Sequence, residues 1–500
     1  MNTLKKFHKI FKVTNHTQHV GPKSLFYVFN SGKNNKNYIE EAYKKGARGF
    51  FFRKEDIPNA KELKSKLPEA MFFEVNSNKP IFNMFAEHCA KTYGYPAKKI
   101  VVIGITGTKG KSSTAIIMSV YLKNFGYKVA MMSSAFHCIN NDLFEAQLTT
   151  EKADYIHAFL SEALQKGVTH AIIEVSAQAL SLSRMYGIAF DLIIFTNFYP
   201  DHLEFFGSDK NYFEAKTKIF ENIKKNGTIL YPSLDKKVSK FIKNFSKKNS
   251  FGIKYVPIDN SETNQRKFEI TAKSIDGLSI KINNIASNME YFLKTKLYGT
   301  HNAENIFVSY LAICNLLKNT LPNQWTKCFE NFSNFSFIPG RGERYTTENN
   351  IKIYIDNVHN PLPFENILSD LKDQSEHLLV IFGCGGDRDY RRRKELAQIA
   401  EKYAREIFIT EDNPRNESLE NITENILSGF SKIDNVHIIN DRILAIGKAM
   451  KLAKSNSIVA LLGRGNSNLT IRGINQVDYG SDLEIIRSLG YNVTPVETTV

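Results

Sequence analysis

A glycine-rich loop between a predicted strand and a predicted helix is the feature that most constrains the fold of this chain. An apolar run over 100–105 predicts a buried strand, and a helical pattern extends over 113–125. The loop between them contains Thr106-Gly-Thr-Lys-Gly-Lys-Ser-Ser113. Strand, glycine-rich loop and helix in this order are typical of an α/β domain that binds phosphate groups at the amino end of the helix.

The residue types in this loop suit a nucleoside triphosphate. Gly107 and Gly110 allow backbone N–H groups to surround phosphate oxygens. Lys111 would neutralise the β- and γ-phosphates, and the Ser112 hydroxyl would reach Mg²⁺. The strict phosphate-loop pattern starts with a glycine where Ile105 stands here, so the loop is a shorter form. The alternative interpretation is a tight strand–helix turn that is rich in glycine by chance.

Length, composition and charge favour a large cytoplasmic protein. The 500 residues suffice for about three domains, and we expect neither a signal peptide nor a membrane span. Five scattered cysteines favour a reducing cytosol over a disulfide framework or a zinc site. The net charge of +15 fits a lysine-rich solvated surface or polyanionic substrates. We expect a monomer with no nucleic-acid or membrane partner.

Alternating strands and helices predict three α/β domains, at 1–98, 99–338 and 339–500. The central and third domains are each expected to contain a parallel sheet. In the first domain we predict strands at 24–29 and 49–52 and a helix at 37–45. The predicted strands of the other two domains include 129–133, 170–175, 192–196, 351–355, 378–382, 406–410, 436–439 and 458–462, with a helix at 302–317.

Polar sequences follow four predicted strands of the third domain. In open α/β sheets, ligands bind outside the carboxyl ends of the strands, so these sequences predict a binding site. They are Asp356-Asn-Val-His359, Gly383-Cys-Gly-Gly-Asp-Arg-Asp389, Asp412-Asn-Pro-Arg415 and Gly463-Arg-Gly-Asn466.

Three polar residues of the central domain are candidates for metal chemistry. Glu174 ends a predicted strand and His202 follows another, so a carboxylate and an imidazole could bind a metal there. Each also has an ordinary explanation, as a strand-end acid and a loop histidine. Lys216, on a helix expected to begin near Ser208, shares a face with apolar residues. It either extends its ammonium to water or is a functional lysine in a site with little water.

Taken in order, these motifs resemble those of the Mur ligases of peptidoglycan synthesis. The shared set comprises the 106–113 loop, Glu174-Val-Ser176, Thr196-Asn197, Asp201-His-Leu203, Ala215-Lys216, His301-Asn302, Pro339-Gly-Arg341 and the Asp356–His359 pair. Within this family the chain is most similar to the MurE type, the UDP-N-acetylmuramoyl-tripeptide synthetases. That similarity rests on Leu148-Thr-Thr150, Gly383-Cys-Gly-Gly-Asp-Arg-Asp389 and Asp412-Asn-Pro-Arg415.

The resemblance implies a UDP-binding domain, a central ATPase domain and a C-terminal Rossmann-like domain, and with them a definite reaction. ATP would phosphorylate the terminal carboxylate of UDP-N-acetylmuramoyl-L-alanyl-D-glutamate, and the amine of the next amino acid would then attack the acyl phosphate. We favour meso-diaminopimelate as that amino acid, followed by a related diamino acid such as lanthionine and then L-lysine, because an arginine in the Asp412–Arg415 segment suits a distal carboxylate.

The resemblance also assigns roles to individual residues. The residues that take part in catalysis would be Lys111, Glu174, His202 and Lys216. The metal ligands would be Ser112, Glu174, His202 and Lys216. Lys216 would bind the metal as a carbamate, which turns its cationic side chain into an anion. ATP would contact Gly107, Thr108, Lys109, Gly110, Lys111, Ser112, Ser113, Asn302, Arg341 and Asp356. The UDP-muramoyl dipeptide would contact Thr17, Thr149, Thr150, Ser176 and Arg184. The incoming amino acid would contact Arg388, Asp412, Asn413, Arg415, Gly463 and Ser467.

Several positions depart from the family pattern. The main one is Ser467, which replaces a glutamate expected to hold the distal ammonium of meso-diaminopimelate; Glu411 or Asp412 could supply the missing charge. The others are Lys109, Gln178, Asn357, Asn466 and the segment His16-Thr17-Gln18. These departures leave open ligation of L-lysine or another diamino acid, a folylpolyglutamate- or cyanophycin-like ligase, and a non-catalytic nucleotide-binding regulator.

Overall fold

The computed structural model describes residues 5–7, 10–29, 35–57, 60–75, 80–249, 252–259, 266–284, 288–317, 322–333, 335, 338–465, 467–473 and 475–496. The chain divides into two compact units. The first comprises Met1–Phe198, Phe213–Asp259 and Ala312–Leu316, and the second comprises Tyr199–Tyr212, Asn260–Leu311 and Leu317–Val500.

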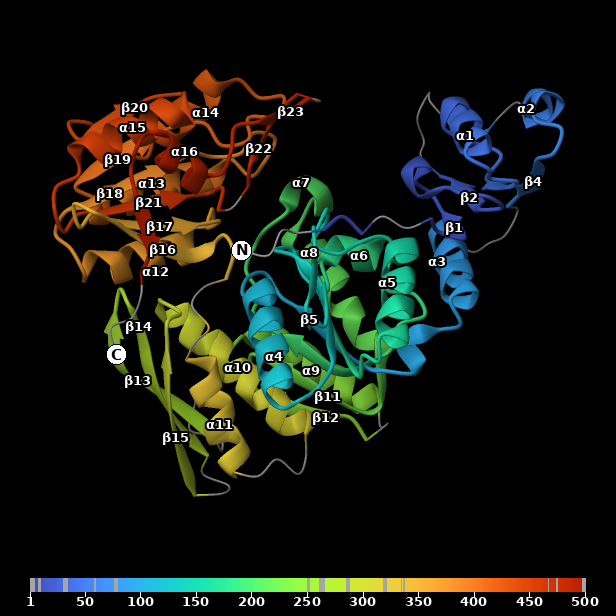
Figure 1. The fold of residues 1–500 in the computed structure, drawn as a ribbon, viewed down its shortest axis with the longest axis horizontal. Helices are drawn as coiled ribbons and strands as arrows, with labels where there is room; N and C mark the ends of the chain where they lie inside the picture. The colour runs from blue at the N-terminus through green and yellow to red at the C-terminus, as the bar shows by residue number, and fades with distance from the viewer. Residues whose placement is uncertain are drawn as a thin grey trace. The chain divides into compact units, whose positions relative to one another are not determined.

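A four-stranded parallel sheet lies within the first 98 residues (Figure 1, blue). Its order is β1 (Val13–Thr14), β2 (Leu25–Val28), β3 (Gly49–Phe52) and β4 (Met71–Glu74). The helices are α1 (Asn35–Lys44), α2 (Ala60–Lys66) and α3 (Ile81–Thr92). Strands β2 and β3 and helix α1 confirm the sequence prediction. The strands carry aromatic residues at facing positions, so Tyr27, Phe51 and Phe73 stack with ring centroids 4.8 and 4.7 Å apart.

The second sheet of the first unit has eight strands in the order β12-β11-β10-β5-β9-β6-β7-β8. The bounds are β5 (Val101–Thr106), β6 (Val129–Met132), β7 (His137–Ile139), β8 (Asp142–Phe144), β9 (His170–Glu174), β10 (Phe190–Phe195), β11 (Ile223–Tyr231) and β12 (Lys254–Pro257). All neighbours pair in parallel except the β6–β7–β8 segment, which is antiparallel. Strand β5 lies between β9 and β10, so the segments that follow these three strands meet at one sheet edge.

Helices on this sheet are α4 (Lys111–Asn124), α5 (Ala153–Gln165), α6 (Ala177–Ser181), α8 (Asp209–Thr217) and α9 (Lys236–Lys248). The buried core between strands and helices is aliphatic and aromatic, with Val102, Ile173 and Phe159 almost fully enclosed. Helix α4 has apolar residues on nearly all sides and is buried along most of its length. It therefore gives the loop before it a rigid support.

The second unit contains a seven-stranded sheet in the order β20-β19-β18-β21-β17-β16-β24. The bounds are β16 (Arg341–Thr347), β17 (Lys352–Asp356), β18 (Leu378–Phe382), β19 (Glu406–Ile409), β20 (Val436–Ile438), β21 (Ile458–Leu462) and β24 (Val493–Pro495). Its helices are α12 (Pro361–Lys372), α13 (Arg391–Tyr403), α14 (Leu419–Leu427), α15 (Arg442–Leu452) and α16 (Asp482–Ser488). Strands β17 to β21 pair in parallel, which confirms the predicted second α/β sheet.

Smaller elements complete this unit. An antiparallel sheet of β13 (Arg266–Ser274), β14 (Gly277–Asn284) and β15 (Met289–Thr295) packs through β15 against α11 (Pro322–Phe332) (Figure 1). Helix α10 (Thr300–Leu316) covers the run predicted at 302–317, and α7 (Leu203–Phe206) is a single turn. A hairpin of β22 (Leu469–Arg472) and β23 (Asn475–Asp478) follows β21.

The predicted α/β class with parallel sheets is confirmed. Each sheet lies inside one of the domains predicted at 1–98, 99–338 and 339–500, but these boundaries stay a prediction because the chain divides into two compact units. In the part of the chain that the structure describes, no helix is both long and apolar enough to cross a membrane.

Candidate functional site

The glycine-rich loop connects the end of β5 to the start of α4 through two glycines in the left-handed region. Gly107 has φ +135° and Gly110 has φ +81°. A side chain at Gly107 would overlap the Thr196 hydroxyl, so glycine is required there for steric as well as conformational reasons. Helix α4 begins directly after this turn, with Gly110 as a cap that makes no side-chain hydrogen bond. The first N–H groups of a helix have no intrahelical partner, and such an amino end is suited to binding phosphate.

Two residues at the end of β10 hold this loop in place. The Asn197 side-chain oxygen accepts from the Lys109 N–H at 2.8 Å, and the Asn197 carbonyl accepts from the Thr108 N–H at 3.0 Å. The Thr196 hydroxyl donates to the Lys109 carbonyl at 2.6 Å. Thr196 and Asn197 belong to the motif set recognised in the sequence, but their positioning role was not predicted.

Lys111, Ser112 and Glu174 gather around this turn. The ammonium of Lys111 donates to the Thr108 carbonyl at 3.0 Å and lies 3.9 Å from a carboxylate oxygen of buried Glu174. The other Glu174 oxygen accepts from the Ser134 N–H at 2.8 Å, and the hydroxyls of Ser134 and Ser112 are 2.8 Å apart. Ser134 is a residue that the sequence prediction missed.

The oxygens of Ser112 and Glu174 are hard donors of the kind that Mg²⁺ prefers. Among the described residues no group of three or more histidine, cysteine or acidic side chains is arranged to hold a metal. A magnesium site here would therefore combine these oxygens with phosphate oxygens and water, which is how Mg²⁺ is usually bound beside nucleotides.

Lys216 does not extend to water. It lies near the end of α8, is 1% exposed, and donates from Nζ to the Gly107 carbonyl at 2.6 Å. The interpretation as a solvent-directed lysine is therefore wrong, because the amine enters the site beside the loop. The helix ends at Thr217, and the buried residues Ile219 and Phe220 belong to a 3-10 turn over Lys218–Asn222.

Three of the residues expected to contact the dipeptide form one cluster at the end of β9. The Thr150 hydroxyl donates to the Glu174 carbonyl at 2.8 Å and accepts from the Ser176 N–H at 2.9 Å. The Arg184 guanidinium donates to the Thr150 carbonyl at 2.5 Å, and burial lowers the pKa of Arg184. Thr149 is adjacent and partly exposed.

Thr17 is not part of this hydrogen-bonded cluster and lines a cavity of about 270 Å³. Lys152 donates to the Asn15 side chain at 3.4 Å, and burial lowers the pKa of Lys152. Burial, followed by the charge of Lys152, also lowers the pKa of His16. The cavity is lined by Asn15, His16, Thr17, Phe26, Tyr27, Val28, Phe29, Asn35, Tyr38 and Lys152.

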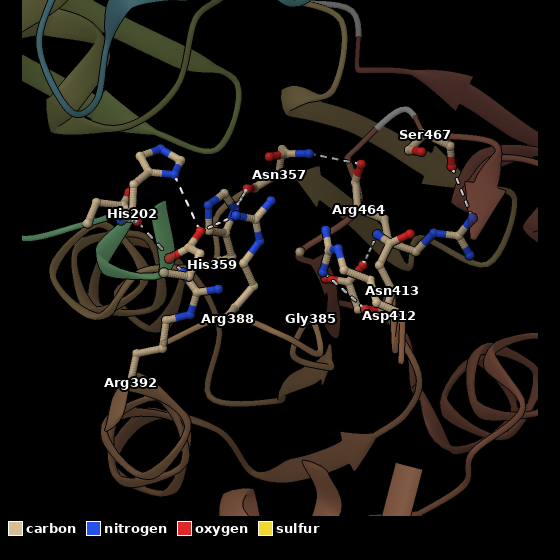
Figure 2. Close-up of a pocket in the computed structure, with 14 residues that line it drawn as sticks. His202, Asn357, His359, Gly385, Arg388, Arg392, Asp412, Asn413, Arg464 and Ser467 are labelled. Carbon is tan, nitrogen blue, oxygen red and sulfur yellow. Dashed lines mark hydrogen bonds and ion pairs between the residues drawn. The ribbon is translucent and has the colours of Figure 1, made fainter. Parts of the chain in front are cut away.

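A second cavity, of about 290 Å³, lies in the second unit (Figure 2). It contains every residue expected to contact the incoming amino acid: Arg388, Asp412, Asn413, Arg415, Gly463 and Ser467. These residues come together because β18 lies between β19 and β21, so the segments after the three strands share one edge. Figure 2 shows His202 and Arg388 on one side of this pocket and Asp412 on the other. Four more lining residues, Asn357, His359, Gly385 and Arg464, belong to the strand-end sequences that predicted a binding site at this edge. The lining residues not expected in this pocket are Asp201, His202, Glu204 and Arg392.

The pocket is rich in arginine. Arg415 has φ +52° and donates from Nη1 to the carbonyls of Gly386 at 2.9 Å and Asn413 at 3.2 Å. Burial lowers the pKa of Arg415, and the nearby charge of Arg388 lowers it further. Arg388 forms an ion pair with Glu204. Four arginines and the three acids Asp201, Glu204 and Asp412 line the cavity, so positive charge is in slight excess and favours an anionic group of a ligand.

Only one of the two acids proposed to replace the family glutamate is available to a ligand. Both carboxylate oxygens of Glu411 accept from Arg472 at 2.8 Å, and the Glu411 side chain is 1% exposed. Asp412 lines the pocket, where burial raises its pKa against the opposing charges of Arg442 and Arg464. The Ser467 hydroxyl donates to the Leu469 carbonyl at 3.2 Å, whereas Asn466 lies outside the described residues.

The remaining predicted nucleotide residues also belong to the second unit. Arg341 and Asp356 are opposite each other in the antiparallel pair β16–β17. The Asn302 side chain is buried and donates to the Tyr298 carbonyl at 2.8 Å. His202 has φ +54° and its Nδ1 lies 3.7 Å from Glu204.

Comparison with known proteins finds two domain families in this chain. The Mur ligase middle domain matches residues 105–313, and the Mur ligase glutamate ligase domain matches residues 340–465. A UDP-N-acetylmuramoyl-L-alanyl-D-glutamate–2,6-diaminopimelate ligase of Buchnera aphidicola subsp. Baizongia pistaciae is 32% identical over 94% of this chain and 91% of that protein. A ligase of the same name from Clostridium acetobutylicum is 28% identical over 91% of this chain and 89% of that protein.

Solved structures show the same fold. One of a UDP-N-acetylmuramoyl-L-alanyl-D-glutamate–2,6-diaminopimelate ligase has a TM-score of 0.61 at 21% identity, covering 96% of this chain and 94% of that one. The MurF ligase of Thermotoga maritima, in complex with ADP, has a TM-score of 0.66 at 16% identity, covering 96% and 97%.

Fold, phosphate loop and matches together define an ATP-dependent ligase. The chain belongs to the Mur ligase family, and its resemblance to the MurE type is confirmed.

Proposed function

We propose that this protein joins a diamino acid, preferably meso-diaminopimelate, to UDP-N-acetylmuramoyl-L-alanyl-D-glutamate at the expense of ATP. The observation that carries the amino-acid part of the proposal is the arginine-rich pocket of the second unit, which contains all six residues expected to contact that substrate. ATP and UDP-linked precursors are cytoplasmic compounds, so we propose a cytoplasmic enzyme, and one that acts as a monomer.

The reaction needs a carboxylate oxygen of the dipeptide to attack the γ-phosphorus of ATP, with ADP leaving. The amine then attacks the acyl carbon, inorganic phosphate leaves, and the amine loses a proton. Lys111 and the loop N–H groups would stabilise the charge on the transferring phosphate. Thr150, Ser176 and Arg184 would hold the dipeptide, and the position of their cluster directly beside Glu174 supports this role.

Ser112, Glu174, His202 and carbamylated Lys216 would hold Mg²⁺, which when bound neutralises phosphate charge. The oxygen donors of Ser112 and Glu174 beside the loop support this assignment. The burial of Lys216 supports the carbamate, because loss of water favours the neutral amine over the ammonium. The nitrogen of that neutral amine would bond to the carbon of CO₂ and release a proton to solvent.

The cavity around Thr17 is our proposed site for the UDP part of the substrate. Aromatic side chains such as Phe29 and Tyr38 offer surfaces on which a base can stack, and the charge of Lys152 suits phosphate.

The choice of amino acid follows from the charges in the second pocket. Arg415, with Arg388 nearby, offers a carboxylate-binding group, and meso-diaminopimelate has a distal carboxylate whereas L-lysine has none. Asp412, rather than Glu411, would take the distal ammonium in place of the absent glutamate at position 467. Lanthionine has the same charged groups on a similar chain, so it ranks second, and L-lysine ranks third.

One panel tests this proposal. Purified protein is incubated with ATP, Mg²⁺ and UDP-N-acetylmuramoyl-L-alanyl-D-glutamate plus meso-diaminopimelate, lanthionine, L-lysine or L-glutamate, and the products are identified by mass spectrometry. We expect a tripeptide product and ADP release that depends on both the dipeptide and the diamino acid, and no product from K111A. Glutamate addition to a folate would favour the folylpolyglutamate-like alternative. Binding of ATP without formation of ADP or a peptide product would favour the alternative of a non-catalytic nucleotide-binding regulator.

A further inference from the structure

A buried carboxylate follows directly after the two threonines assigned to the dipeptide. Glu151 is 5% exposed, and its Oε1 accepts from the N–H groups of Gln147 at 2.9 Å and Leu148 at 3.0 Å. The same oxygen accepts from Nε2 of His137 at 3.1 Å. His137 is fully buried at the start of β7. One carboxylate oxygen therefore ties the two residues before Thr149 to the edge of the eight-stranded sheet.

The other side of this segment is held separately. Thr150 is bonded through its hydroxyl to the end of β9, and through its carbonyl to Arg184. Thr149 lies between the two anchors, and in the described part of the chain its hydroxyl has no hydrogen-bond partner. A segment fixed on both sides presents Thr149 in one orientation, which lowers the entropy cost of binding a ligand there.

The charge of Glu151 is compensated by its surroundings. Burial alone would raise its pKa, but hydrogen bonds from His137 and from the two N–H groups lower it overall, so the group is ionised at neutral pH. Its negative charge also acts on Arg184, whose pKa burial lowers and Glu151 raises. Removing a buried, hydrogen-bonded carboxylate leaves its donors without partners and Arg184 without part of its counter-charge.

We propose that Glu151, oriented by His137, is a positioning residue for the dipeptide substrate. It fixes the 147–150 segment and the charge of Arg184 without touching the reacting atoms. This inference rests on the proposed function, because Thr149, Thr150 and Arg184 matter for the substrate only if they bind the UDP-muramoyl dipeptide.

Four single variants of the full chain test the inference. E151A removes every contact of the carboxylate. H137L removes the imidazole donor, whereas H137Q keeps an N–H donor near the position of Nε2. E145Q is the matched control, because Glu145 is an exposed acid in the same connection between β8 and α5. For each protein we would measure KM for the dipeptide, KM for ATP, kcat, melting temperature and dipeptide affinity by calorimetry.

E151A and H137L should raise KM and Kd for the dipeptide at least tenfold and leave KM for ATP within twofold. H137Q and E145Q should stay within threefold of the wild type. Dipeptide affinity that is unchanged in E151A and H137L, even with a lower melting temperature, would show a purely structural role and overturn the inference. If E151A does not fold, the dipeptide affinities of H137L and H137Q test the inference instead. Equal affinities of these two variants would overturn it. A wild type that binds no dipeptide would instead overturn the proposed function itself.

Discussion

The amine of Lys216 and the carbonyl oxygen of Gly107 are 2.6 Å apart, which joins helix α8 directly to the phosphate loop. The lysine is almost completely buried, and the glycine has a backbone conformation that other residues rarely adopt. A change in the charge of Lys216 would therefore act at short range, and with little screening by water, on groups bound by the loop.

K216A should lose most activity, with kcat reduced at least 100-fold, because the variant lacks the nitrogen that would carry the carbamate. Acetate or formate should restore part of it by supplying a carboxylate in the same space. K218A is the control, since Lys218 is an exposed lysine two residues further along the chain. Wild-type protein in ¹³C-bicarbonate should show a carbamate carbon signal that K216A lacks. An active K216A, or a wild type with no such signal, would contradict the carbamate.

Substitution of Gly107 tests the loop in a different way. G107A should weaken ATP binding at least tenfold, because the new methyl group overlaps the Thr196 hydroxyl and φ is +135°. G126A is the matched control, since Gly126 also has a positive φ but has no atom within 4 Å of the added carbon. Both variants should lose some stability from backbone strain, but only G107A should lose nucleotide affinity in an equilibrium binding assay. Equal affinities in the two variants would show that the loop does not bind phosphate.

The sequence predicted that six residues from different segments would lie together, and they line one cavity of the second unit for a topological reason. Arg388, Asp412 and Gly463 follow β18, β19 and β21, and neighbouring parallel strands place their carboxyl ends at one edge. Apolar runs that are buried on both faces are also strong sequence signals, so most strands of the two large sheets were predicted to within two residues. The two-residue strand β1 has too few positions to form a pattern and was not predicted.

Pairings between distant side chains could not be predicted in this way. Glu411 is taken by Arg472, 61 positions away, because the β22–β23 segment follows β21 and reaches back to the end of β19. The Asn413 side chain accepts from the Ile471 N–H at 2.8 Å for the same reason. The burial of Lys216 depended on whether its helix packs against the loop, and helical spacing alone cannot decide that. The pairing of His137 with Glu151 has no local signal either.

A buried histidine predicts how stability depends on pH. Burial lowers the pKa of His157 to about 4, from an ordinary value near 6.5, and its Nε2 donates to the Tyr186 carbonyl at 3.2 Å. Between these two pH values the unfolded chain binds a proton at His157 that the folded chain does not bind. The contribution of neutral His157 to the free energy of unfolding is therefore fully present above pH 6.5 and is lost as the pH drops toward 4. Between pH 7.5 and pH 5.0, His157 should therefore lower the free energy of unfolding by about 2 kcal/mol.

H157Q keeps a hydrogen-bond donor and cannot titrate. Its urea unfolding curve should therefore shift less than that of the wild type between pH 7.5 and 5.0. His170 and His301, whose pKa values loss of water also lowers to about 4, are present in both proteins and cancel in the comparison. Identical shifts in the two proteins would mean that His157 is not kept neutral by burial.

The identity of the amino acid depends most on Arg415. R415A should lower kcat/KM for meso-diaminopimelate about 100-fold, because a carboxylate that loses a two-pronged charged partner loses roughly 2–3 kcal/mol. ATP affinity should change less than twofold. R415K should recover only part of the loss, since lysine keeps the charge without the planar fork. R391A is the control, because Arg391 is an exposed arginine that does not line the pocket and pairs with Asp389.

Steady-state kinetics with meso-diaminopimelate and L-lysine separate the outcomes. A wild type that prefers L-lysine, or an R415A that still discriminates between the two, would show that Arg415 does not read the distal carboxylate and that its bonds to Gly386 and Asn413 only shape the loop.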